Sequence, residues 1–239
     1  MQFHLVHAHP EQHSFTAAMR DTIVQSVEAA GNTITVSDLH AMNFNPVMSA
    51  ADFGERKNPE HLTYALEQRH NWEAGTIAED IRGEIEKVMA ADVLAFTFPL
   101  QWFGVPAILK GWIERVMISG LFYGGRRVYG NGGLVGKRAF AAFGLGGRQH
   151  MFGDGAIHGP LVEGMMKHFF QGTLGYVGLK VHEPFIAWHV PYVSDDERGE
   201  MLKDLGGYIR GLETQPVIPM PNLDDFDDRF RPKFTPHVV

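Results

Sequence analysis

The chain of 239 residues contains no cysteine. This absence excludes disulfides, thiolate metal sites, iron–sulfur clusters and a cysteine nucleophile, and it fits a reducing cytoplasm. Residues 1–7 lack both a basic segment and a long apolar segment, so we expect no secretory signal. No apolar run approaches the length that spans a bilayer, which predicts a protein without membrane insertion.

Positive charge is also in short supply, with 21 lysines and arginines against 28 acidic residues and a formal net charge of −7. Such a balance disfavours general attraction to nucleic acid or to an anionic membrane surface. We therefore expect a cytoplasmic protein whose partner is a small molecule and not nucleic acid. The length suits one α/β domain over residues 1–213, followed by a Pro- and Asp-rich tail over residues 214–239 that looks extended.

Short apolar runs alternate with helical patterns along most of the chain. Strands are predicted over residues 2–8, 33–38, 93–98, 138–143 and 180–186. Helices are predicted from Ser14, from Thr76, from Pro106, over residues 160–170 and around residues 201–212. This alternation predicts a doubly wound parallel sheet of five strands with helices on both faces. Residues 40–75 form a polar excursion too long for an ordinary connection.

Ligands of doubly wound sheets bind beyond the carboxyl ends of the strands, near the point where strand order reverses. The first loop at this edge, residues 9–16, runs into a predicted helix, whose free N–H groups suit a phosphate. His9, Ser14 and Thr16 add side-chain donors. Taken alone, the loop favours a plain capped helix. It contains no Gly-x-Gly-x-x-Gly, and no third ligand accompanies His7 and His9, so neither a resident dinucleotide on a Rossmann fingerprint nor a metal is expected.

The second loop, residues 98–106, places Trp102 and Phe103 directly after a buried strand. Flat aromatics with backbone N–H groups suit a planar heterocycle, although they also suit an aromatic plug of the core; the position at the sheet edge favours ligand contact. The third loop, residues 144–148, is rich in glycine, which permits close approach to a ligand but also serves ordinary turns. His158 follows before a predicted helix, where a lone histidine is more often structural.

These loops resemble those of a known family, the FAD-dependent NAD(P)H:quinone reductases of the DT-diaphorase type, which have a flavodoxin-like fold. The longest matching run is residues 99–112, Pro-Leu-Gln-Trp-Phe-Gly-Val-Pro-Ala-Ile-Leu-Lys-Gly-Trp. Residues 9–15, 37–39, 41–46, 146–147, 157–159 and 183–184 extend the match to nearly the whole chain.

The resemblance implies one FAD, in preference to FMN, in each subunit of a homodimer. By position, the cofactor would be held by His9, Ser14, Phe15, Thr16, Pro99, Leu100, Gln101, Trp102, Phe103, Gly146, Gly147 and Arg198. The acceptor would lie against Trp102, Phe103, Phe152 and His158, and against Tyr123, Tyr176, Phe230 and Phe234 of the partner subunit. The tail would therefore pack at the dimer interface.

The chemistry implied by the resemblance is ping-pong. NAD(P)H stacks on the flavin, passes hydride to N5 and leaves, and the acceptor then takes hydride from the same face. Reduction leaves negative charge near flavin N1 and O2, which a tyrosine and a histidine stabilise in the family. His158 matches the catalytic histidine, but Phe152 stands at the tyrosine and cannot donate. Gly144 and Leu145 replace two hydroxyl residues, and Gly125 replaces a second tyrosine.

Two other functions fit the same residues. A nitro- or azo-aromatic reductase would use the same flavin and the same planar pocket. Related flavodoxin-like proteins also act as ancillary subunits of bacterial potassium-efflux systems, although the sequence shows no partner-binding patch and the tail favours the longer quinone reductases. No ribose-reading acidic residue or phosphate-binding arginine can be assigned, so NADH and NADPH are not distinguished.

Overall fold

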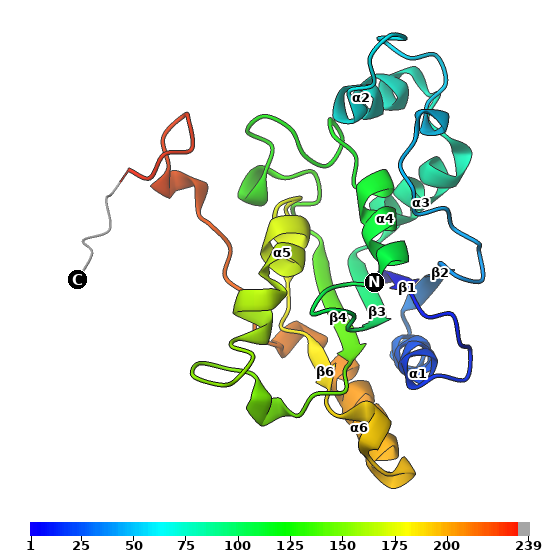
Figure 1. Cartoon of the computed structure of the whole chain (residues 1–239), viewed down its shortest axis with the longest axis vertical. Coiled ribbons are helices and arrows are strands. Elements are labelled where there is room, and N and C mark those ends of the chain that lie inside the picture. The colour runs from blue at the N-terminus through cyan, green and yellow to red at the C-terminus, as the bar shows by residue number, and fades with distance from the viewer. Residues whose placement is uncertain (234–239) are drawn as a thin grey trace.

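The computed structural model describes residues 1–233, in which a parallel sheet is covered by helices on both faces (Figure 1). The strands are β1 (Gln2–His7), β2 (Thr33–Asp38), β3 (Val93–Pro99), β4 (Arg138–Gly144), β5 (Lys180–Val181) and β6 (Phe185–Ala187). The helices are α1 (Phe15–Ala29), α2 (Tyr64–Ala74), α3 (Glu79–Ala90), α4 (Ala107–Val116), α5 (Lys167–Phe169) and α6 (Asp195–Arg210). Within residues 1–233, no helix combines the length and the apolar character needed to cross a membrane.

The strand order is β2-β1-β3-β4-β5, with β6 also pairing with β4, and every pairing is parallel. The chain runs outward from β1 to β2 and then crosses back to β3 on the other side of β1. The direction of winding therefore reverses between β1 and β3. The carboxyl ends of these two strands, at His7 and Pro99, mark the edge where sheets of this kind bind ligands.

The fifth strand position holds two short segments, and the single strand predicted over residues 180–186 was wrong in this respect. β5 pairs with the start of β4, and β6 pairs with its end. Between them, Pro184 has no N–H to donate to a ladder. The Glu183 N–H instead donates to the Pro216 carbonyl at 2.9 Å, and His182 pairs with Val217 in an antiparallel bridge. The break is therefore occupied by the tail.

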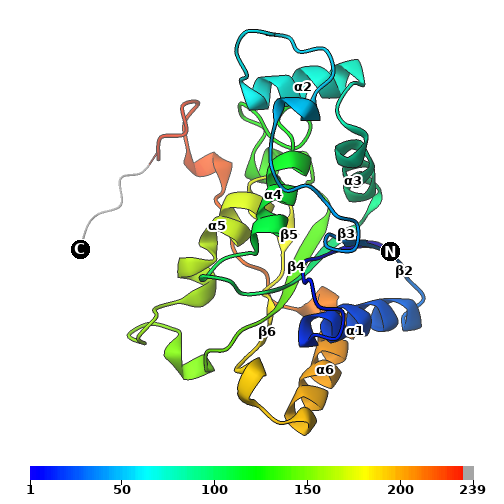
Figure 2. The same ribbon diagram turned by 45° about the vertical axis from the view of Figure 1, so that its right-hand side comes forward.

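The residues of β3 alternate between two apolar layers. Val93 and Ala95 pack with α1 and α6, which lie side by side on one face (Figure 2). Leu94, Phe96 and Phe98 pack on the other face with α3, α4 and α5. A central strand covered on both faces needs apolar residues at nearly every position, which explains the composition of this run.

The polar excursion over residues 40–75 contains a helix, α2, that the sequence pattern did not predict. The buried residues of α2 are polar, namely Glu67, Gln68 and Asn71, so no apolar stripe marks it. The excursion is fixed to α4 by Arg115, whose buried guanidinium donates to Asp52 at 2.8 Å. The segment is thus an ordered part of the domain.

Two further predicted helices differ from those observed. α3 begins at Glu79 and not at Thr76, because Ile77 pairs with Phe53 in an antiparallel bridge. Residues 161–175, predicted as a helix over 160–170, form wide turns around the short α5, with the Met166 N–H donating to the Leu161 carbonyl five residues back. Glycines at positions 164 and 172 lower the intrinsic preference for an α-helix there.

Candidate functional site

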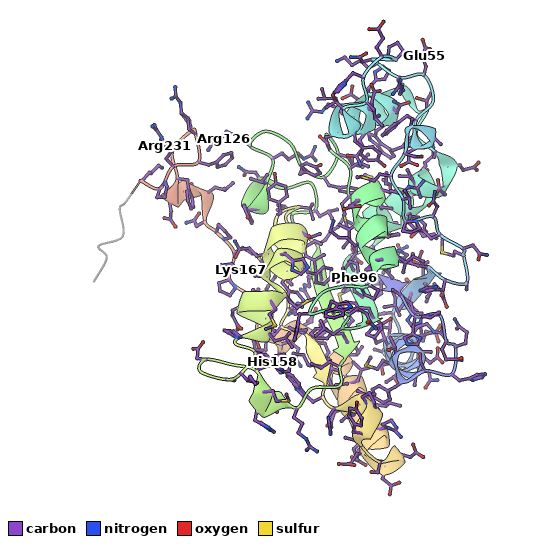
Figure 3. All side chains as sticks on the ribbon, viewed as in Figure 1. Glu55, Phe96, Arg126, His158, Lys167 and Arg231 are labelled. Carbon is purple, nitrogen blue, oxygen red and sulfur yellow. The ribbon has the colours of Figure 1, made fainter. Side chains whose placement is uncertain are left out.

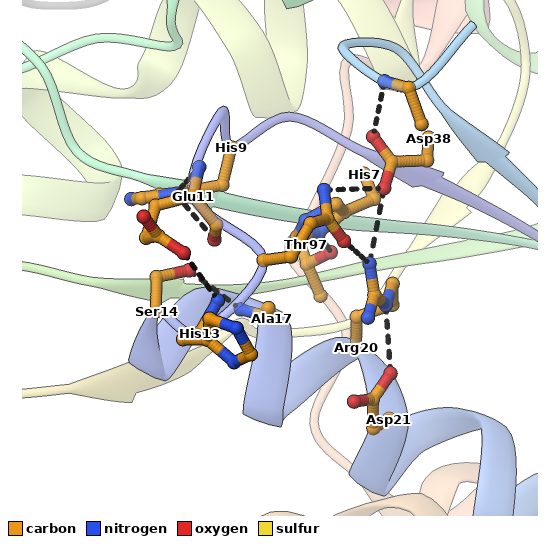
Figure 4. A network of polar contacts seen from close by, with 12 residues as sticks. His7, His9, Glu11, His13, Ser14, Ala17, Arg20, Asp21, Asp38 and Thr97 are labelled. Atoms are coloured by element: carbon orange, nitrogen blue, oxygen red, sulfur yellow. Dashed lines mark hydrogen bonds and ion pairs between the residues drawn. The ribbon is translucent and has the colours of Figure 1, made fainter.

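The loop after β1 leads into a capped helix (Figure 4). Ser14 Oγ accepts the Ala17 N–H at 3.1 Å, as the plain capping interpretation expected. The N–H groups of Phe15 and Thr16 have no hydrogen-bond partner within residues 1–233, as is usual for a first turn. The Glu11 N–H contacts His9 Nδ1 at 3.0 Å, which holds the ring against the loop backbone. Capping therefore leaves donors at this end for an anion.

Polar groups beneath this loop hold the ends of three strands together (Figure 4). The His7 side chain is fully buried, and its Nδ1 is hydrogen-bonded to Thr97 Oγ1 of β3 at 2.8 Å. Burial lowers the pKa of His7 to about 4, so the ring is neutral near pH 7. Arg20 of α1 reaches Asp38 at the end of β2 at 3.1 Å. These contacts tie the carboxyl ends of β1, β2 and β3 to one another and to α1.

Trp102 and Phe103 form the two central positions of a tight hairpin turn. The Gln101 N–H donates to the Gly104 carbonyl at 3.0 Å, and the Gly104 N–H donates back at 2.9 Å. Both central residues have positive φ, 48° and 58°, where a type I′ turn normally carries asparagine or glycine. Trp102 is 97% exposed and Phe103 is 40% exposed. An exposed aromatic pair in a strained backbone indicates function, and it excludes the interpretation as a core plug.

Phe103 belongs to an aromatic cluster with Phe152, His158 and Trp188. Its ring centroid lies 5.4 Å from that of His158 and 6.3 Å from that of Phe152. Phe152 lies 5.0 Å from His158 and 5.4 Å from Trp188. The structure therefore brings together the predicted residues of the second loop and of the segment before residue 160. Trp188, which follows β6 directly, was missed; the rule that sites lie at strand ends, applied to the fifth strand, would have found it.

Gly146 and Gly147 follow β4 beside this cluster. A Cβ on Gly147 would lie 2.8 Å from Phe152 Cε2, so glycine is what allows the ring to lie against the backbone. A Cβ on Gly146 would have room, since its nearest neighbour is Tyr192 Cε2 at 3.7 Å. The Gly144 carbonyl accepts the Leu100 N–H at 2.8 Å, which ties the second and third loops together. Pro99 and Leu100 are half-buried at this junction.

The predicted residues Tyr123, Tyr176 and Phe230 form a second group. The rings of Tyr123 and Tyr176 are 5.6 Å apart and line a cavity of about 410 Å³. Phe230 lines an adjoining cavity of about 300 Å³, and the Arg126 guanidinium lies 5.1 Å above its ring. In Figure 3, Arg126 is far from His158. Within one chain, this second group therefore lies away from the cluster around His158. Phe234, also predicted to belong to the second group, lies outside the described residues.

Arg198, expected near the adenine end of a cofactor, is engaged within the chain. Its guanidinium donates to the carbonyls of Val190 and Val193 at 2.9 and 2.8 Å, and to Asp195 at 2.9 Å. These bonds fix the segment that leads into α6. Most of the Arg198 N–H donors are therefore already bonded within the chain.

The order of the sheet, with its reversal between β1 and β3, defines a flavodoxin-like α/β protein. Residues 1–208 match the family described as flavodoxin-like fold. The chain is 36% identical over 211 residues to NAD(P)H dehydrogenase (quinone) 1 of Rattus norvegicus, covering 88% of this chain and 76% of the relative. It is also 36% identical over 220 residues to the human ribosyldihydronicotinamide dehydrogenase (quinone), covering 90% and 93%.

Solved structures agree with these relatives. A structure from Klebsiella pneumoniae superposes with a TM-score of 0.90 at 30% identity, covering 95% of this chain and 91% of the other. An NAD(P)H:quinone oxidoreductase from Methanothermobacter marburgensis superposes with a TM-score of 0.71 at 28% identity, covering 89% and 96%. The chain belongs to the NAD(P)H:quinone oxidoreductase family of flavodoxin-like oxidoreductases, so the expected fold and family are confirmed.

Proposed function

We propose that the protein is a flavin-dependent reductase that passes two electrons from NAD(P)H to a quinone. The observation that carries the proposal is the strained turn of Trp102 and Phe103 beside His158, at the point where the sheet reverses. FAD, when bound, supplies a two-electron carrier between donor and acceptor. The protein supplies binding, orientation and hydrogen-bond donors.

The residues present fit an elongated cofactor with an anionic middle and a planar end. The free N–H groups of Phe15 and Thr16, with the Ser14 hydroxyl, suit the phosphates. The turn after Pro99 and the backbone of residues 146–147 suit the planar ring. We propose FAD and not FMN, since the long run of residues 99–112 resembles FAD enzymes. Arg198 would act here by holding the segment before α6.

The side chains of this site have two different roles in the proposed reaction. Trp102 and Phe103 present flat surfaces beside the proposed flavin site. A nicotinamide and then a planar acceptor would lie there in turn, since both use the same face of the flavin. Of the two donor positions known in the family, His158 keeps its donor, whereas Phe152 offers none. His158 therefore stabilises the negative charge of the reduced cofactor without the help of a tyrosine.

The second aromatic group completes the site in the proposal, as part of a homodimer. Tyr123, Tyr176 and Phe230 lie apart from His158 in their own chain and line cavities of their own. In a homodimer these residues of the partner subunit would cover the acceptor. The tail over residues 214–239, placed outside the domain of residues 1–213, would then carry Phe230 to the interface.

The test begins with the visible spectrum of the purified protein and with chromatographic identification of the released flavin. We expect a yellow dimer that releases FAD and reduces quinones with NAD(P)H. A colourless protein that cannot be reconstituted with FAD or FMN would contradict the proposal. Comparison of kcat/KM for quinone, nitro and azo acceptors then decides the acceptor class. Higher values for nitro or azo compounds would replace quinone as the substrate.

A further inference from the structure

The loop after β4 is held through its carbonyl groups by the segment after β6. The Val190 N–H donates to the Leu145 carbonyl at 3.0 Å, and the His189 N–H donates to the Gly147 carbonyl at 2.9 Å. Between these bonds, Nδ1–H of the His189 ring donates to the Gly146 carbonyl at 2.7 Å. The N–H groups of Gly146 and Gly147 themselves have no hydrogen-bond partner within residues 1–233.

The His189 ring is well placed to fix one of these free N–H groups. Because a peptide bond is planar and trans, its carbonyl and its N–H point in opposite directions. The Gly146 carbonyl and the Gly147 N–H belong to the same peptide. A peptide between two glycines rotates easily, since neither residue has a Cβ to restrict it. The bond from Nδ1 therefore decides where the Gly147 N–H points.

His189 is in turn held in an unusual conformation. Its φ is +59°, a left-handed value that costs a non-glycine residue about 1 kcal/mol or more. Its ring lies 4.8 Å from that of Tyr192, and the Tyr192 N–H donates to its carbonyl at 2.9 Å. Tyr192 is 73% exposed, so this pair lies at the molecular surface and not in the core. Nothing about the apolar core requires a histidine here.

We propose that His189 is a positioning residue that aims the Gly147 N–H at the flavin and so strengthens binding of the reduced flavin over the oxidised one. This inference rests on the proposed function, because it requires a flavin beside residues 146–147. A fixed N–H dipole stabilises negative charge without reorganisation, and the reduced flavin is the more negative state. Loss of the ring would free the Gly146–Gly147 peptide and lower the midpoint potential of the bound flavin.

The test compares midpoint potentials of flavin-loaded variants. His189→Ala removes the donor, whereas His189→Asn keeps an amide donor near the position of Nδ1 and tolerates a left-handed backbone. We expect alanine to weaken the preference for reduced flavin about tenfold, which is about 30 mV for a two-electron couple, while affinity for oxidised flavin changes less than about twofold. Asparagine should restore the wild-type potential. His61→Ala, at an exposed site in the residue 40–75 excursion, is the control.

Two outcomes overturn the role of His189. One is a wild-type potential in flavin-loaded His189→Ala, and the other is the same lowered potential in both variants, since asparagine retains the donor. If alanine does not retain flavin, His189→Gln takes its place, because its longer side chain carries the amide away from Gly146. A wild-type chain that takes up no flavin refutes the proposed function instead.

Discussion

The phenyl ring of Phe152 faces the imidazole of His158 with their centroids 5.0 Å apart and their planes tilted by 41°. The resemblance of the sequence to the family implies a tyrosine at the Phe152 position, so in the proposed site this contact joins the retained donor to the position of the missing one. Gly147 lies against the same ring, near its Cε2 and Cζ atoms. The contact makes both side chains suitable for testing the proton-donating part of the site.

Restoring the hydroxyl with Phe152→Tyr should leave reduction of the flavin by NAD(P)H unchanged or make it faster, by up to about tenfold. The reason is that a phenol would add a donor without changing the ring that packs against His158 and Trp188. Stopped-flow absorbance measures the rate, with Phe185→Tyr as the control on a half-buried ring elsewhere. A large loss of rate would show that this pocket is organised differently from that of the family.

Removing the imidazole with His158→Ala should slow flavin reduction about tenfold to hundredfold, while flavin affinity falls only a few-fold. In the proposed function the imidazole acts on charge that develops during reduction, whereas the neighbouring aromatic rings would still hold the flavin. The measurements are stopped-flow rates at saturating NAD(P)H and flavin titration of the apoprotein. His150→Ala, at an exposed position in the same segment, serves as control. Wild-type rates in His158→Ala would remove the catalytic role.

Replacing Trp102 by glycine should stabilise the apoprotein by about 1 kcal/mol and weaken flavin binding at least tenfold. Glycine relieves the positive φ of 48°, and the lost ring is 97% exposed, so little burial is forfeited. Urea unfolding measures the first effect, and flavin titration measures the second. Lower stability of the apoprotein would show that the turn is not strained, and unchanged affinity would show that the ring does not contact flavin.

Acid should destabilise the protein through His7. Burial lowers its pKa from 6.5 to about 4 in the folded state, so only the unfolded chain takes up a proton between these values. The stability contribution of the neutral ring is complete above pH 6.5 and is lost as pH falls to about 4, by about 3 kcal/mol. Urea unfolding from pH 7 to 4 should show a shallower decline for His7→Asn than for wild type. Equal slopes would contradict the assignment, and exposed His13→Asn is the control.

Local pattern was sufficient for much of the fold. The apolar run that became β3, the Ser14 cap and the glycine-rich loop after β4 each carry their structural signal in adjacent residues. α2 could not be predicted in this way, because its buried residues, Glu67, Gln68 and Asn71, are polar and leave no apolar stripe. The partner of Gln68, the Glu114 carbonyl, is also distant in sequence. The break in the fifth strand was not predicted either, although Pro184 lies at the break and cannot donate a backbone hydrogen bond there.

The candidate site was predictable where a single loop carries it and unpredictable where loops meet. Trp102 and Phe103 stood out by composition, whereas the catalytic role of His158 was inferred from the resemblance alone. Trp188 and His189 were missed because their composition does not stand out, and only the rule that sites lie at strand ends, applied to the fifth strand, points to them. Their contacts with Phe152 and Gly146 depend on the order of the strands, which single residues do not encode.

The antiparallel bridge between His182 and Val217 has a consequence for solubility. An uncovered sheet edge presents N–H and carbonyl groups that pair readily with other chains, which leads to aggregation. Here the tail supplies its own Ile218 N–H to the Val181 carbonyl at 2.9 Å and lies along the break between β5 and β6. Apart from its proposed role at the dimer interface, the tail therefore protects this edge against pairing with other copies of the chain.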